Sequence, residues 1–212
     1  MTRIAVLGGT GYAGRHIIAE AAQRGHTVVS VTRSVAAERV EGATYIEGTI
    51  LDAPSLVTEL EGVEVVVSAV APRGDMLGLV RPNTAELVAE LPPTVRFGVI
   101  GGAGGSRIAP GGPRVVEGDF PDEFLAEAME AIGVLEDLQS NVLGHDWFFV
   151  HPPLAFGAFR TGERTGNYRT GGDVVVTDET GDSYISGEDL AVAVLDEIEN
   201  PTHHRAAFTV GY

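Results

Sequence analysis

Residues 3–18 read Arg-Ile-Ala-Val-Leu-Gly-Gly-Thr-Gly-Tyr-Ala-Gly-Arg-His-Ile-Ile, and this stretch decides the fold. It begins with an apolar run from Ile4 to Leu7, which is typical of a strand buried on both faces of a parallel sheet. Gly8, Gly11 and Gly14 follow at Gly-x-x-Gly-x-x-Gly spacing, and apolar residues then recur with the period of a helix. Such a turn lets the backbone approach a pyrophosphate, whose charge then lies at the helix N-terminus. The stretch therefore predicts a dinucleotide cradle.

The glycine spacing alone is a weak signal, because an ordinary strand-to-helix turn can also carry glycines. Here a strand precedes the glycines and a helix follows them, which is the context that a dinucleotide motif requires. Gly25 supplies a stop for that helix. Within the turn, Thr10 and Tyr12 are expected to flank the phosphates, and the Thr10 hydroxyl can donate to them.

Composition narrows the class of protein. The 212 residues fit one domain, on a prior of about 100–200 residues per domain, and 44% hydrophobic residues supply a sizeable core. Cysteine is absent, which excludes disulfides, thiolate metal sites and a cysteine nucleophile. The net charge of −16 argues against nucleic-acid binding and is typical of a solvated acidic surface. With neither a signal sequence nor an apolar stretch long enough for a membrane span, we expect a cytoplasmic protein.

The second predicted strand, Thr27–Thr32, is rich in β-branched residues and ends at Arg33. Folds of this kind distinguish the two nicotinamide cofactors at this point: an acid there binds the ribose 2′-hydroxyl of NAD, whereas an arginine suits the 2′-phosphate of NADP. Ser34 is a further neutral donor, and the next acid along the chain is Glu38. The alternative is an ordinary surface arginine. The sequence favours NADP(H) over NAD(H).

Strands and helices alternate along the rest of the chain. Further strands are predicted at Ala43–Glu47 and at residues 64–72, 95–100, 146–151 and 207–210. Parallel strands joined by crossover helices give an α/β fold, with one doubly wound parallel sheet flanked by helices. We expect residues 1–212 to form a single Rossmann-like domain. Its substrate side, including a small C-terminal extension, is expected from residues 101–121 and 151–186.

Candidate cofactor contacts follow three of these strands. Thr49 and Ile50, after the third strand, are placed to cover an adenine ring. Ala69 and Ala71, after the fourth strand, are small enough to let the chain pass close to a cofactor. Residues 101–121 are rich in Gly and Pro and leave the carboxyl end of a central strand, which predicts a lid or binding loop. The alternative for this segment is a disordered surface loop.

Some local predictions concern single elements. Asp52 is expected to cap the helix after the third strand. Residues 174–176 are predicted to form a small hairpin. Ser186 and Asp189 form a predicted capping box, in which the Asp189 carboxylate reaches back to the cap. A long amphipathic helix is expected to place in the core Phe124, Leu125, Ala128, Met129, Ile132, Leu135 and Leu138.

By its motifs the chain resembles the atypical, small branch of the short-chain dehydrogenase/reductase superfamily. It is most similar to the NAD(P)H-binding proteins grouped with biliverdin-IXβ/flavin reductase and with the NmrA-like regulators. The resemblance is carried by Gly8-Gly-Thr-Gly-Tyr-Ala-Gly14, Arg33, Val99-Ile-Gly-Gly-Ala103, His151-Pro-Pro153 and Ser183-Tyr-Ile-Ser-Gly-Glu-Asp-Leu-Ala191.

The resemblance implies an NADP(H) molecule lying across the carboxyl edge of the sheet. Arg33 would hold the 2′-phosphate. The pyrophosphate would be held by Gly8, Thr10, Gly11, Tyr12, Ala13 and Gly14. The ribose and nicotinamide would be lined by Ala69, Val70, Ala71, Pro72, Gly101, Gly102, Ala103, His151, Pro152 and Pro153.

One departure from the superfamily matters. Members that reduce carbonyls use a Tyr-x-x-x-Lys pair, in which the lysine lowers the pKa of the tyrosine. This sequence contains no lysine at all, since its 14 basic residues are all arginine. The departure disfavours conventional alcohol dehydrogenase chemistry. It favours hydride transfer to a planar conjugated acceptor such as a flavin or quinone, for which solvent supplies the proton and the protein supplies orientation.

The leading hypothesis is therefore an NADPH-dependent reductase of a small planar acceptor. The alternative is an NADP(H)-binding redox sensor of the NmrA-like type, which signals through a protein partner. Epimerase chemistry on a nucleotide sugar is disfavoured, because the chain is short for a substrate domain. His151 and Ser106 are the candidate catalytic residues, although each also has an ordinary structural interpretation. No metal site is predicted, and both a monomer and a homodimer stay open.

Overall fold

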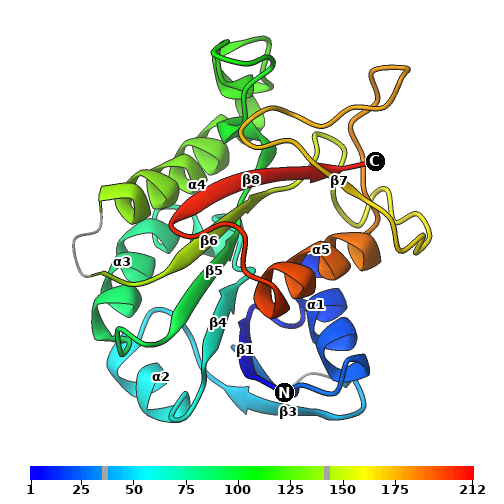
Figure 1. The fold of residues 1–212 in the computed structure, drawn as a ribbon. Coiled ribbons are helices and arrows are strands. Elements are labelled where there is room, and N and C mark those ends of the chain that lie inside the picture. Colours follow the sequence, from blue (N-terminus) through cyan, green and yellow to red (C-terminus); the bar gives the residue numbers. More distant parts are fainter. Residues whose placement is uncertain (35–37, 141–143) are drawn as a thin grey trace.

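The computed structural model describes residues 1–34, 38–140 and 144–212. Across these residues one eight-stranded sheet has the strand order β3-β2-β1-β4-β5-β6-β8-β7 (Figure 1). Neighbouring strands are parallel, except that β7 pairs antiparallel with β8. The strands are β1 (Arg3–Leu7), β2 (Thr27–Thr32), β3 (Ala43–Glu47), β4 (Val65–Ser68), β5 (Arg96–Ile100), β6 (Trp147–His151), β7 (Arg169–Thr170) and β8 (Ala206–Gly211). The predicted doubly wound α/β fold is confirmed.

Helices cover both faces of this sheet (Figure 1). On one face lie α1 (Tyr12–Gln23) and α5 (Gly187–Glu199); on the other lie α2 (Ala53–Glu59), α3 (Val80–Glu90) and α4 (Asp122–Ser140). Short 3-10 helices occur in the connections as η1 (Gly74–Met76), η2 (Ala103–Gly105) and η3 (Val115–Glu117). As predicted, Asp52 caps α2, and its Oδ1 accepts a hydrogen bond from the Ser55 amide at 3.2 Å.

Alternate residues of β1 supply both halves of the core. Ile4 and Val6 belong to the apolar cluster under α1 and α5, whereas Ala5 and Leu7 belong to the cluster on the opposite face. This central position explains the continuous apolar run in the sequence. From β1 the sheet grows toward β2 and β3 on one side and toward β4 and β5 on the other. The point where the order reverses is where ligands bind in folds of this kind.

A buried ion pair joins β5 to α5 at the edge of the sheet where β5 begins. The Arg96 guanidinium donates to Glu197 Oε1 at 2.5 Å and to the Glu197 carbonyl at 2.7 Å. Thr202 donates its hydroxyl proton to the same carboxylate at 2.8 Å, and His203 Nδ1 lies 2.7 Å from it. Burial raises the pKa of Glu197, but the hydrogen bonds from Arg96, His203 and Thr202 outweigh burial and lower it to about 2.

The predicted hairpin at residues 174–176 is wrong. The Val175 amide instead donates to the Arg107 carbonyl at 2.9 Å, and the Arg107 amide donates to the Asp173 carbonyl at 2.7 Å. Val175 therefore pairs with residues 101–121, and the Val174 amide donates to the Gly171 carbonyl at 3.0 Å, so residues 174–176 do not pair with one another as a hairpin.

The predicted capping box is half correct. Ser186 Oγ accepts from the Asp189 amide at 3.0 Å, as expected. The Asp189 carboxylate, however, does not reach back. It is fully buried and accepts from the amides of Thr165 and Gly166, each at 2.8 Å, and from the Tyr212 hydroxyl at 2.5 Å. A buried carboxylate needs several hydrogen-bond donors, and two of those used by Asp189 are amides of the loop before β7. Asp189 therefore holds this loop in place.

The assignment of core positions in α4 is wrong at the start of the helix. Ala128, Ile132, Leu135 and Leu138 are buried as predicted. Phe124, Leu125 and Met129 are exposed. Phe124 lines an open cavity instead of packing on the sheet, whereas Leu125 and Met129 lie outside the cavity wall.

Replacing Glu197 with Gln is expected to lower the free energy of unfolding by about 3 kcal/mol, because the buried Arg96 guanidinium keeps only its more exposed partner, Asp146. Urea unfolding followed through Trp147 fluorescence measures this loss. In the wild type the contribution is complete above the unfolded pKa of about 4.3 and is lost as the pH falls toward 2, so the Gln variant should show a shallower acid dependence. Glu90→Gln removes an equal charge from an exposed site and is the control. Equal losses in both variants would contradict the assignment.

Candidate functional site

A cavity of about 1180 Å³ opens along the carboxyl edge of the sheet. Segments following β1, β2, β3, β4, β5 and β6 all contribute to its wall. It therefore spans the switch point between β1 and β4 and is large enough for an extended ligand.

The glycine turn forms one wall of this cavity. Gly8 has a φ of +76°, a conformation that favours glycine, and its carbonyl accepts from the Gly11 amide at 2.9 Å. A Cβ atom at Gly14 would lie 2.3 Å from the Gly8 carbonyl oxygen, so only glycine lets α1 pack this closely on the turn. Gly14 does not itself line the cavity; its role is to let α1 pack closely on the turn.

The N-terminus of α1 faces the cavity without a side chain that would satisfy its amides. Gly11 is the N-cap and makes no side-chain capping bond, and the first turn holds no acidic residue. Uncapped amides and the helix dipole favour an anion at this place. Tyr12 lines the cavity, but its hydroxyl bonds to the Thr161 carbonyl at 3.2 Å and to the Gly187 amide at 3.1 Å. Its phenol thus ties the turn to α5 and to the segment after β6.

Of the residues predicted to contact the cofactor, all except Gly14 and His151 line this one cavity. They are Gly8, Thr10, Gly11, Tyr12, Ala13, Arg33, Thr49, Ile50, Ala69, Val70, Ala71, Pro72, Gly101, Gly102, Ala103, Pro152 and Pro153. The fold thus brings together residues that are far apart in the sequence. Their contact with a cofactor stays a prediction.

The two candidate catalytic residues are buried and do not line the cavity. His151 Nδ1 lies 2.8 Å from the Gly102 carbonyl, and its ring packs against Phe149. Burial lowers the pKa of His151 and so favours the neutral imidazole. The bond to Gly102 opposes this shift in part. Ser106 Oγ donates to the Ala103 carbonyl at 2.5 Å. These bonds fix the start of residues 101–121, and catalytic roles for both side chains stay predictions.

Arg33 lines the cavity at the end of β2 and is paired with an acid that the sequence did not reveal. Asp75, in η1, forms an ion pair with its guanidinium. Both side chains are well exposed, at 56% and 71%. Asp75 lies 42 residues from Arg33 along the chain, so no local pattern connects the two.

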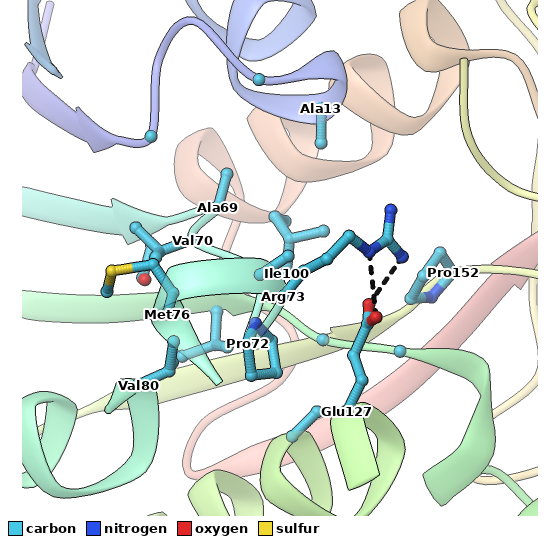
Figure 2. Close-up of a pocket in the computed structure, with 18 of the residues that line it drawn as sticks. Ala13, Ala69, Val70, Pro72, Arg73, Met76, Val80, Ile100, Glu127 and Pro152 are labelled. Atoms are coloured by element: carbon cyan, nitrogen blue, oxygen red, sulfur yellow. Dashed lines mark hydrogen bonds and ion pairs between the residues drawn. The ribbon is translucent and has the colours of Figure 1, made fainter. Parts of the chain in front are cut away.

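A second arginine crosses the cavity mouth. Arg73, after β4, donates from Nε to Glu127 Oε2 at 2.9 Å and from Nη2 to Oε1 at 2.6 Å. Figure 2 shows the two side chains pointing toward one another from the segment after β4 and from α4. This bidentate bond raises the pKa of Arg73. Neither residue was predicted from the sequence, although the position of Arg73 directly after a strand exit is a signal that could have identified it.

Aromatic and aliphatic side chains from two segments line the cavity. Phe120 and Phe124 come from the start of α4 and the residues before it, and Leu154, Phe156 and Phe159 follow β6. We call these five residues the aromatic end. Phe124, Leu154 and Phe159 are exposed, and large exposed apolar side chains around a cavity are typical of a binding site. These five residues were not predicted from the sequence as a group.

A glycine turn at a helix N-terminus, an arginine after the second strand and a cavity across the switch point together define a Rossmann-like dinucleotide-binding protein. The sequence profile of a family described as NAD(P)H-binding matches residues 8–201, and the chain belongs to this family. The expected membership of an NAD(P)H-binding family is thereby confirmed.

Similar proteins cover the whole chain. YwnB of Bacillus subtilis, described as uncharacterized, is 32% identical over 98% of this chain and 97% of its own. The crystal structure of a "putative NADH-flavin reductase" from Streptococcus pneumoniae superposes with a TM-score of 0.85 at 30% identity, covering 100% of this chain and 99% of that one. A "putative epimerase" from Bacteroides thetaiotaomicron gives a TM-score of 0.86 at 30% identity, covering 100% and 97%.

Among the described residues, no helix combines the length and apolar character that crossing a membrane requires.

Replacing Gly14 with Ala is expected to weaken NAD(P)H binding at least about tenfold, because the new methyl group pushes α1 away from the Gly8 carbonyl and misplaces the helix N-terminus. Titration with NADPH, followed through Trp147 fluorescence, measures the change. Gly118→Ala is the matched control, since a Cβ there makes only an ordinary contact of 3.5 Å with the Val115 carbonyl. Unchanged affinity in a folded Gly14 variant would contradict the cradle.

Proposed function

We propose that this protein is an NADPH-dependent reductase that transfers hydride to a small planar, conjugated acceptor such as a flavin or a quinone. One observation carries the proposal: a single cavity joins the glycine turn to the aromatic end. The S. pneumoniae neighbour described as a reductase supports this reaction, whereas the B. thetaiotaomicron neighbour described as an epimerase is equally similar. The choice between them therefore rests on the cavity itself.

The residues present fit a nicotinamide dinucleotide. The uncapped N-terminus of α1 offers amides to a pyrophosphate, and the close seat of Gly14 on Gly8 keeps the backbone free of side chains there. Ala69 and Gly101, after β4 and β5, leave space for the nicotinamide end. When bound in reduced form, the cofactor supplies a hydride, which with one proton from solvent completes a two-electron reduction of the acceptor and leaves the cofactor oxidised.

The chain itself contributes orientation and shape. Rings at the aromatic end can stack a planar acceptor and exclude water from it. Epimerisation with a tyrosine as the acid–base group needs a free hydroxyl beside the reacting carbon. Among the described residues that line the cavity, Tyr12 is the one tyrosine. Its hydroxyl is already hydrogen-bonded to the Thr161 carbonyl and the Gly187 amide. Reduction of a conjugated acceptor needs no such group, which favours the reductase.

The preference for NADPH over NADH is part of the same proposal. Arg33 lies where a 2′-phosphate binds in this fold, and its exposed guanidinium can donate two hydrogen bonds to an anion. Asp75 competes for that guanidinium. The 2′-phosphate must therefore displace a carboxylate, and this competition weakens NADPH binding without reversing the preference.

NADPH consumption with free flavins, quinones and tetrapyrroles tests the reaction. We expect turnover with at least one planar acceptor, because the cavity joins both binding regions, and none with simple aliphatic carbonyls. NADPH affinity is recorded on the same sample through Trp147 fluorescence. Tight NADPH binding without turnover of any acceptor would contradict the reductase and favour the sensor.

Replacing Arg33 with Asp is expected to weaken NADPH binding by about two orders of magnitude, because a phosphate then meets a carboxylate instead of a guanidinium. NADH binding should change little. Asp75→Asn is the opposite control: it frees Arg33 and should tighten NADPH binding several-fold with no effect on NADH. Equal losses of both cofactors in the Arg33 variant would overturn the assignment of the 2′-phosphate site.

A further inference from the structure

The charged side chains near the aromatic end carry a net negative charge. Among the described residues lining the cavity, the charged ones are Arg33, Arg73, Asp119 and Glu127. Arg33 follows β2, on the far side of β1 from the segments that build the aromatic end. Asp119 directly precedes Phe120, and Glu127 lies on α4 one turn after Phe124. Two acids and one arginine therefore surround the place where an acceptor would lie.

The one arginine of this group is already paired with a carboxylate. Both of its hydrogen bonds to Glu127 are short and parallel, the geometry in which a guanidinium matches a carboxylate best. The Arg73 side chain is 70% exposed and that of Glu127 is 24% exposed, so the pair lies at the boundary between cavity and solvent. An anionic group entering here meets Asp119 and a neutralised pair. To use Arg73, it would have to displace Glu127, which would leave a second unpaired carboxylate beside it.

We propose that the Arg73–Glu127 pair, together with Asp119, makes the aromatic end select uncharged acceptors over anionic ones. The inference rests on the reductase function proposed above and narrows its substrate class. It favours quinones and flavins without a phosphate over flavin mononucleotide and acceptors bearing carboxylates. Glu127 is in this sense a specificity-determining residue, because it cancels the cation that would otherwise attract an anion.

Two pairs of acceptors that differ in one anionic group test the proposal. They are riboflavin against flavin mononucleotide, which share one chromophore, and 1,4-naphthoquinone against its 2-sulfonate. The readout is the ratio of kcat/KM for the neutral member to that for the anionic member. Wild-type protein is expected to favour the neutral member.

Glu127→Gln should shrink this ratio by about fivefold or more, since Arg73 becomes a free cation at a partly exposed site. Arg73→Gln should enlarge it, because Glu127 then stands unpaired. Glu123→Gln, on the same helix but outside the cavity wall, removes an equal charge and should leave the ratio unchanged. The effect of Glu127→Gln should fade at about 1 M salt, where the Debye length is only about 3 Å. A loss of packing would not depend on salt in this way.

Other results would overturn the inference. Wild-type preference for the anionic member, abolished by Arg73→Gln, would mean that acceptors displace Glu127. Equal ratios in the Glu127 and Glu123 variants would mean that the pair does not select by charge. If the wild type turns over no acceptor, the reductase function fails separately. Binding of riboflavin and flavin mononucleotide to the NADP⁺-saturated protein, followed by flavin fluorescence, then decides: a riboflavin preference that falls in Glu127→Gln supports charge selection, and equal or absent binding overturns it.

Discussion

The close seat of α1 on the turn after β1 is the constraint on which the site depends. Since a side chain at Gly14 would meet the Gly8 carbonyl at 2.3 Å, the helix can approach this closely only because position 14 is glycine. The same closeness recurs where α5 meets α1, because a Cβ at Gly187 would lie 2.3 Å from the His16 ring. Tyr12 bonds across this contact to the Gly187 amide. The direction of the α1 N-terminus is therefore set by backbone packing on two sides, which gives the cradle its fixed geometry.

Much of this fold could be predicted from the sequence because its signals are local. The apolar run of β1, the β-branched run of β2 and the spacing of Gly8, Gly11 and Gly14 each lie within a few residues, and each predicts one element. Parallel strands then bring their carboxyl ends to one edge whatever the sequence between them. Residues as distant as Thr10 and Pro152 could thus be assigned to the same cavity.

The ion pairs of the site could not be predicted, because they join residues without a shared pattern. Arg33 and Asp75 are 42 residues apart, and Arg73 and Glu127 are 54 apart. Nothing near Glu127 distinguishes it from the other acids of α4. The hairpin expected at residues 174–176 failed for a related reason: these residues form no strand, and the backbone partner of Val175 lies elsewhere in the chain. The fold, and not the local sequence, therefore determines which charged side chains form ion pairs and which backbone segments pair with each other.

The far edge of the sheet has a consequence for how the protein behaves at high concentration. An open strand presents unpaired amides and carbonyls that can recruit a strand from another molecule. Here the outer strand, β7, is only two residues long and antiparallel to β8. It covers the end of β8 with an element too short to template a further strand. The chain thus leaves less of this edge open to strand addition and amyloid-like stacking, with a cap over the end of β8 made from the same C-terminal extension that borders the cavity.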